Sequence, residues 1–208
     1  MVQTDFNTDD DDCDGWILDG HACGMAAYNS QTEMRTGGSR LKCFNDDLSD
    51  RYHSNCSFPT GTIPNDATIT AVALHIYFVG RVKPKRFNWN VASDARMQIT
   101  TAKNQIGAEL DTSDYDYGTV RYNSAAFKNW VTAEWKEFDL GTSSVYKDGD
   151  TDVEIRPNDD WWQDCDDQGK DYYLRWYTNE KTFPAYKPYL RVTYTVKGKS
   201  YVQLIGAS

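Results

Sequence analysis

The clearest alternation of apolar and polar residues in the chain covers residues 68–79. Successive side chains of an extended strand point to opposite faces, so a period of two predicts a β-strand with one apolar face. Burial of each large side chain on that face contributes about 1.5–3 kcal/mol. We therefore expect this segment to be the central strand of the fold. Its apolar face comprises Val72, Leu74, Ile76 and Phe78.

A second strong alternation covers residues 189–196, with Leu190, Val192, Tyr194 and Val196 on one face. Turn signals separate further short segments of this kind, and no long amphipathic helix is indicated. The pattern predicts an all-β protein, an antiparallel two-sheet β-sandwich of jelly-roll-like topology with roughly nine to eleven strands. The other strand candidates lie at residues 16–18, 40–44, 87–91, 95–101, 135–140, 151–156, 172–177 and 201–205, and residues 51–58 lead into the central strand.

The length of 208 residues suits one large all-β domain, and no linker divides the chain. We expect the sandwich to span residues 14–196. Residues 1–13 form an acidic N-terminal arm, which is either solvated or bound to a cation. Residues 197–208 form a C-terminal extension that contains the last strand candidate.

The formal net charge of −9 and the isoelectric point near 4.8 argue against a nucleic-acid partner, because a phosphate backbone requires a basic face. No run of about 18 apolar residues is present, so we expect no membrane-spanning helix.

The N-terminus begins at Met and lacks the basic and apolar regions of a secretory signal. Two explanations stay open: a leader that was replaced by the start Met, or assembly inside a cell without secretion.

Five cysteines are present, and none of them forms a CxxC pair. This spacing weighs against an ordinary structural zinc site. In an oxidising compartment Cys13 and Cys23 are plausible disulfide partners, as are Cys43 and Cys56. The spacing does not decide whether either disulfide forms. Asn55 begins a glycosylation sequon, which is a weak signal because its central residue is Cys56.

Aspartates crowd one turn and the loop after the next predicted strand. Calcium prefers about six to eight oxygen ligands, and closely spaced carboxylates repel one another unless a cation lies between them. The sequence therefore offers a calcium site, although solvated turns explain the same residues and the twelve-residue loop with a final glutamate is missing. Calcium is thus the one cofactor that the sequence suggests, with solvated turns as the favoured explanation. The candidate ligands are Asp148, Asp150, Asp152, Asp159 and Asp160.

Aromatic residues make up 14% of the chain, which suits both a large core and a binding surface. Two tryptophans lie in the acidic loop at residues 158–171, and tyrosines follow directly. Flat aromatic rings stack against a pyranose ring while neighbouring carboxylates bond its hydroxyl groups. A protein contact explains exposed rings equally well, and we expect Trp176 in the core. The candidate carbohydrate-binding residues are Trp161, Trp162, Tyr172 and Tyr173.

The sequence contains no catalytic motif that we can identify by spacing. HExxH, GxSxG and phosphate-binding glycine loops are absent. The three histidines, His21, His53 and His75, are scattered, and we expect His75 to be a structural histidine on the central strand. Carboxylate pairs are abundant in any acidic chain and do not by themselves identify a glycosidase. We therefore predict no catalytic residues and no enzymatic activity.

Several successive segments resemble one family of domains. These segments are FPTGTIPNDATITAVALHIYF, DYDYG, WKEFDLGTSSVYKDGDTDVEIRP, YYLRWYTNE and KPYLRVTYTV. Together they resemble the DNRLRE-type β-sandwich domain, which is similar to a carbohydrate-binding module family and occurs in extracellular and phage or virion proteins. The resemblance spans about residues 14–195, although the Asp expected after Phe58 is missing and the Ser-x-Glu element reads Thr178-Asn179-Glu180. Because these motifs mark turns and core strands, the resemblance implies an architecture and brings no catalytic residues.

Together these features predict a non-enzymatic structural or surface protein, most concretely a virion decoration or fibre component on a carbohydrate-binding-like sandwich. The alternative is a secreted carbohydrate-binding module, an adhesin or a filament subunit. We expect a location on a virion or an extracellular surface. The expected partners are further copies of the chain or capsid and filament neighbours, with a glycan as another candidate. Both chain ends are candidates to pair with a neighbour's sheet edge.

Overall fold

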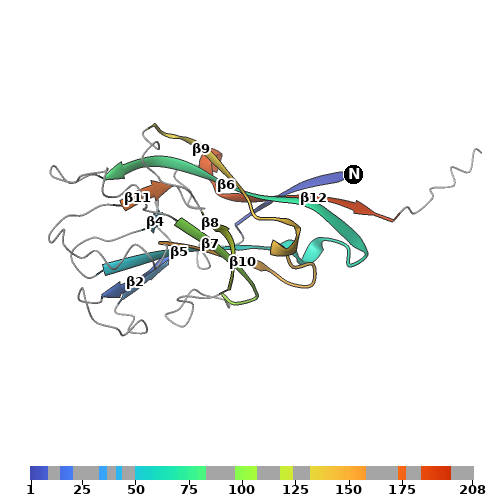
Figure 1. The fold of residues 1–208 in the computed structure, drawn as a ribbon, viewed down its shortest axis with the longest axis horizontal. Coiled ribbons are helices and arrows are strands. Elements are labelled where there is room, and N and C mark those ends of the chain that lie inside the picture. The colour runs from blue at the N-terminus through green and yellow to red at the C-terminus, as the bar shows by residue number, and fades with distance from the viewer. Residues whose placement is uncertain are drawn as a thin grey trace, which may run out of the picture.

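The computed structural model describes residues 1–8, 15–20, 33–36, 41–43, 50–82, 97–106, 118–123, 132–157, 173–176 and 184–197. Within these ranges the chain forms two antiparallel sheets packed as a sandwich, with short 3-10 helices and no α-helix. Figure 1 shows the two layers, one containing β6, β9 and β12 and the other containing β2, β5 and β10. The predicted all-β antiparallel sandwich is thus confirmed. Among the described residues, no helix is long and apolar enough to span a membrane.

The first sheet, sheet A, has the strand order β1, β12, β6, β11, β4, and β9 also pairs with β6. The second, sheet B, has the order β3, β2, β5, β10, β7, β8. The strands of sheet A are β1 (Val2–Asn7), β4 (Leu41–Cys43), β6 (Ala67–Val82), β9 (Glu134–Asp139), β11 (Tyr173–Trp176) and β12 (Tyr189–Val196). Those of sheet B are β2 (Gly15–Gly20), β3 (Glu33–Thr36), β5 (Asp50–Phe58), β7 (Met97–Lys103), β8 (Thr119–Asn123) and β10 (Thr151–Pro157). The 3-10 helices are η1 (Thr60–Thr62), η5 (Thr142–Ser144) and η7 (Pro184–Tyr186).

Strand β6 is the axis of sheet A. It pairs antiparallel with β12 along its first half, with β9 along its middle and with β11 at its end. At His75 it has Tyr189 of β12 on one edge and Glu137 of β9 on the other. The strand therefore lies inside the sheet, where its backbone groups are paired on both sides.

The core lies between the two sheets. The predicted apolar face of β6 is buried along its whole length, since Val72 is 1% exposed and the other three residues are 0% exposed. On β12, Leu190 and Val192 are fully buried, while Tyr194 and Val196 are partly buried against the core. Sheet B supplies Phe58, Met97, Ile99, Val153 and Ile155. Trp176 of β11 is also fully buried, as predicted.

The first residues of the chain belong to the sandwich and are not a free arm. Val2–Asn7 form β1, which pairs antiparallel with β12, as Figure 1 shows. Phe6 is buried in the core, and Asp5 accepts two hydrogen bonds from Arg191. The sequence pattern did not predict this strand, because Phe6 is the only large core residue in VQTDFN. The predicted boundary at residues 13 and 14 lies outside the described residues.

Cys56 is buried in the core, 1% exposed. It pairs with Val153 in sheet B, whereas the backbone of Cys43 pairs with Leu174 in sheet A. A Cys43–Cys56 disulfide would therefore join the two layers, and it stays a prediction. Cys13 and Cys23 lie outside the described residues, so their pairing stays a prediction.

Candidate functional site

The predicted carbohydrate platform falls almost entirely outside the described residues. Trp161, Trp162 and Tyr172 are not among them. For Tyr173, only the backbone pairing with Val82 at the start of β11 is described. The platform therefore stays a prediction.

The predicted calcium ligands divide into two groups. Asp159 and Asp160 lie outside the described residues. Asp148 accepts a 2.6 Å hydrogen bond from Lys103 Nζ, and this bond lowers the pKa of the Asp148 carboxyl. Asp150 is partly exposed in the same turn. Within the described ranges, no group of three His, Cys, Asp or Glu side chains is placed to hold a metal ion.

Asp152, the fifth predicted ligand, is fully buried on the outer face of sheet B. It points away from the core because its neighbour Val153 on β10 points into the core. Ser57 Oγ donates a 2.6 Å hydrogen bond to Oδ1, and the backbone N–H of Ile106 donates a 2.8 Å bond to Oδ2. Burial raises the pKa of this carboxyl. Asp152 thus links β10 to β5 and to the turn after β7, and both of its carboxylate oxygens accept hydrogen bonds from the protein.

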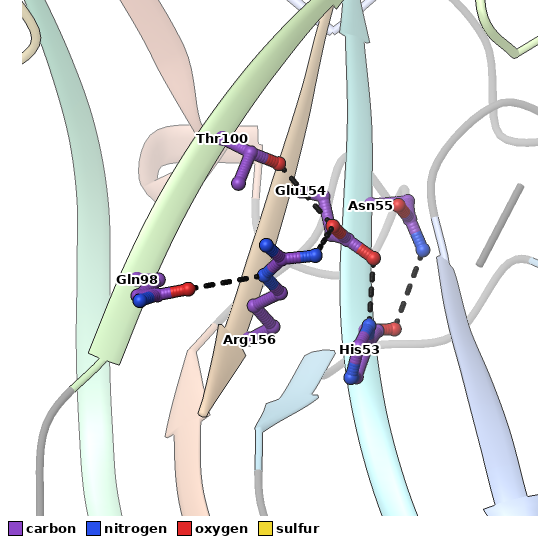
Figure 2. Close-up of polar contacts among 6 residues, drawn as sticks. All are labelled: His53, Asn55, Gln98, Thr100, Glu154 and Arg156. Atoms are coloured by element: carbon purple, nitrogen blue, oxygen red, sulfur yellow. Dashed lines mark hydrogen bonds and ion pairs between the residues drawn. The ribbon is translucent and has the colours of Figure 1, made fainter. Parts of the chain in front are cut away.

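A buried polar network covers the same outer face of sheet B, and Figure 2 shows its contacts. Its centre is Glu154 of β10, which is 0% exposed and lies opposite Asn55 of β5 and Thr100 of β7. Asp152 and Glu154 alternate along β10 with the core residues Val153 and Ile155, and the structure buries these polar residues as well. The network comprises His53, Asn55, Gln98, Thr100, Glu154 and Arg156.

The hydrogen bonds of this network converge on the Glu154 carboxylate. His53 Nδ1 lies 2.6 Å from Oε1, and because a carboxylate only accepts, the imidazole donates from Nδ1. Thr100 Oγ1 and Arg156 Nη1 donate to Oε2 at 3.2 and 3.3 Å. Arg156 Nε in turn donates to Gln98 Oε1 at 3.3 Å. A buried charge needs such donors, since desolvation of an unpaired carboxylate costs several kcal/mol.

A histidine paired with a glutamate is also found in acid–base sites, but here both residues are buried as structural residues are. The side chains of His53 and Glu154 are only 7% and 0% exposed, and both Glu154 oxygens accept hydrogen bonds from neighbouring side chains. Asn55 is fully buried and donates through Nδ2 to the carbonyl of His53, which makes its sequon unsuitable for glycan attachment. We interpret the network as fixing the register of β5, β7 and β10.

The outer face of sheet A differs, because it presents aromatic rings to solvent. Trp135 is 39% exposed, and its ring meets Tyr77 and Tyr189 edge-on at centroid distances of 5.5 and 5.4 Å. Tyr77 also packs against Tyr186 of η7 at 4.1 Å. We call this cluster the aromatic surface. It comprises Tyr77, Trp135, Tyr186 and Tyr189.

Strand register brings these rings together. Tyr77 lies directly opposite Trp135 across β6 and β9, and Tyr189 lies opposite His75 across β12 and β6. Because Leu74 and Ile76 face the core, His75 and Tyr77 must face outward. The rings therefore stand on a hydrogen-bonded sheet, which holds them in place without a ligand.

Charged groups border the aromatic surface on the neighbouring strands. Arg191 of β12 donates to both carboxylate oxygens of Asp5 at 2.8 and 3.0 Å, and its guanidinium carbon lies 5.3 Å from the Tyr189 ring centroid. The hydrogen bond from Arg191 lowers the pKa of Asp5, and the same bond raises the pKa of Arg191. On β9, Glu137 is an exposed carboxylate opposite His75.

His75 lies beneath this surface and is 5% exposed. Tyr189 stacks on its imidazole at 4.4 Å between centroids with an interplanar angle of 7°. Its Nε2 has no hydrogen-bond partner among the described residues, and the nearest ionic group, Glu137 Oε2, is 3.8 Å away. The prediction of a structural histidine fits the burial, but buried polar atoms ordinarily have a partner.

Sequence reasoning missed this surface because its residues come from separated segments. The available signal is that Tyr77 and Tyr189 occupy the polar positions of two strands whose other face is apolar, and that Trp135 alternates with Phe138 on a third. Large aromatic residues at solvent-facing positions are candidates for contact. Strand register was needed to show that they converge.

No family model matches the chain, and no curated protein matches it. The resemblance to the DNRLRE-type domain therefore holds for the two-sheet antiparallel β-sandwich, which the structure has. The family itself is not identified.

Replacing Glu154 with Gln should lower the free energy of unfolding by about 2–4 kcal/mol, because the amide group places a donor where the carboxylate accepts from buried donors. Urea denaturation measures this change. The matched control is Glu134→Gln, an exposed glutamate whose side chain pairs with Lys136 and is 49% exposed. The control should lose less than about 1 kcal/mol. Equal losses for the two variants would contradict a network that fixes the sheet.

Burial lowers the pKa of His75 below its ordinary value of 6.5, with Glu137 opposing and Arg191 reinforcing this effect. The unfolded chain then binds the proton more readily, so stability should fall as the pH drops below about 6.5. Titration of the imidazole signals by NMR should give a lowered pKa, and Glu137→Gln should lower it further. In His75→Phe, part of the pH dependence of stability should disappear. A normal pKa for His75 would show that the ring is hydrated.

Proposed function

We propose that this chain is a non-enzymatic structural protein of a virion, a fibre or another extracellular surface, and that the aromatic surface attaches it to carbohydrate. The observation that carries the proposal is the exposed Trp135 ring beside Tyr77 and Tyr189 on the outer face of sheet A, with Tyr186 of η7 packed against Tyr77. Aromatic rings with polar groups at their border are the usual lining of ligand sites. The His–carboxylate pair of sheet B, by contrast, is buried and engaged.

The surface suits a flat, hydroxyl-rich ligand. Trp135 offers an apolar ring area that loses contact with water when a pyranose ring covers it, which is favourable at about 25 cal/mol per Å². Glu137 lies on the same strand as that ring and Arg191 lies two strands away on β12, and they supply an acceptor and donors for hydroxyl groups. A location on a particle or an extracellular surface follows as the setting in which such attachment is useful.

Trp135→Ala should weaken binding to the preferred glycan by at least about tenfold, equivalent to about 1.4 kcal/mol. A glycan array identifies the ligand, and isothermal titration calorimetry measures the affinity of each variant. The matched control is Val120→Ala, which removes another exposed apolar side chain, 44% exposed, from β8 of sheet B. The control should bind as the wild type does. Failure of the wild-type protein to bind any glycan, or normal binding by Trp135→Ala, would overturn the proposal.

A second candidate function, assembly with further copies or neighbouring subunits, is favoured by strand β1. It ends the order of sheet A, and its outer edge has no partner strand among the described residues. The open N–H and C=O groups of such an edge pair readily with another strand. Val2, at the start of β1, is 43% exposed and lacks the charge that usually protects an edge.

Val2→Lys should shift the chain from oligomer to monomer, because a lysine on an edge strand opposes pairing with a second strand. Size-exclusion chromatography with light scattering, over a range of protein concentrations, measures the mass. Val120→Lys places the same charge on β8, the terminal strand of sheet B, and should leave the mass unchanged. A wild-type protein that is monomeric at every concentration would exclude this function.

A further inference from the structure

We propose that His75 and Glu137 together bind one hydroxyl group of a neutral pyranose that lies on the aromatic surface. This inference rests on the proposed carbohydrate binding and adds the polar contact that orients the sugar. It assigns a ligand-binding role to two residues that sequence reasoning did not connect.

The two groups face each other beside the exposed ring. His75 and Glu137 are directly opposite across β6 and β9, and Tyr189 lies opposite His75 on the other edge of β6. Trp135 is two residues from Glu137 on the same strand, so its side chain leaves from the same face. A ring stacked on Trp135 therefore lies within reach of this polar pair.

The distance between the two atoms suits a bridging hydroxyl. His75 Nε2 and Glu137 Oε2 are 3.8 Å apart, too far for a good hydrogen bond but close enough for one oxygen to lie about 2.8 Å from each. The side chain of Glu137 is 68% exposed, so it can rotate to admit the oxygen, whereas His75 is held by Tyr189. The site thus combines one fixed group with one adjustable group.

The pair offers one hydrogen-bond donor and one acceptor, and a hydroxyl group can accept from the first and donate to the second. A neutral imidazole with its proton on Nε2 donates to the hydroxyl oxygen, and the hydroxyl proton is donated to the Glu137 carboxylate. Nε2, which has no hydrogen-bond partner among the described residues, would then be satisfied. A buried polar atom without a partner is unfavourable, so a ligand that supplies one gains affinity.

The surrounding charge selects the class of sugar. The charged groups that face His75 are Glu137 on β9, Arg191 on β12 and Asp5 on β1. Arg191 is engaged by Asp5, which leaves Glu137 as the charge nearest to Nε2. A carboxylate on the ligand would be repelled at this position, so we expect neutral hexoses to bind and uronic acids to be rejected.

The test uses the full-length protein, the glycan selected on the array and monodeoxy analogues of its terminal sugar in calorimetric titrations. One deoxy analogue should bind the wild-type protein about tenfold more weakly than the parent sugar. His75→Phe keeps a flat ring against Tyr189 but removes Nε2, and Glu137→Gln keeps the size of the side chain but removes its charge. Each variant should bind the parent sugar more weakly and should no longer distinguish it from that analogue.

Controls separate this inference from the proposed function. His75→Phe should unfold at the same or a higher denaturant concentration than the wild type, which excludes misfolding as the cause of weaker binding. If Trp135→Ala abolishes binding while His75→Phe and Glu137→Gln keep the wild-type affinity and deoxy profile, the inference fails and the proposed function stands. If no sugar binds the wild-type protein, both fail. Tighter binding of a uronic acid than of the neutral sugar would also overturn the inference.

Discussion

Strand β6 couples the two halves of the molecule, because an extended chain must place alternate side chains on opposite faces. Leu74 and Ile76 fill the core between the sheets, and this packing leaves His75 and Tyr77 no direction but outward. Pairing with β12 and β9 on its two edges then fixes which residues stand beside them. The aromatic surface is thus a consequence of the same register that builds the core.

The two sheets use their outer faces differently. Sheet B buries Asp152 and Glu154, and each carboxylate accepts hydrogen bonds from neighbouring segments. Buried charges contribute little net stability, since their desolvation offsets much of the attraction, but they penalise any strand shift that separates the partners. Sheet A places its charged pairs at the solvent side, where Asp5 and Arg191 lie beside exposed rings. The exposed Trp135 ring and the charged pair beside Tyr189 therefore belong to sheet A.

Alternation along single segments predicted the strands that face the core, and it did so because burial of large apolar residues dominates folding. The positions of Val72 to Phe78, Leu190 and Val192, and the burial of Trp176, followed from local pattern alone. The local pattern could not predict which strands pair or in which register. His53 and Glu154 are 101 positions apart, and only the pairing of β5 with β10 brings them into contact. Strand β1 was missed for a related reason, because its polar sequence becomes a strand through Phe6 and the Asp5–Arg191 bridge.

At His75, the centre of the proposed sugar contact, the sequence departs from the most stable local choice. A phenylalanine at this position would stack on Tyr189 equally well and would leave no buried nitrogen without a hydrogen bond. The orphaned Nε2 costs about 1–3 kcal/mol relative to a satisfied group. Under the proposed function, a bound sugar would supply the missing partner. The His75 ring is held in place by its strand and by the stacked Tyr189 ring, so the direction of Nε2 is already set. A sugar that bound there would therefore require little ordering of the protein.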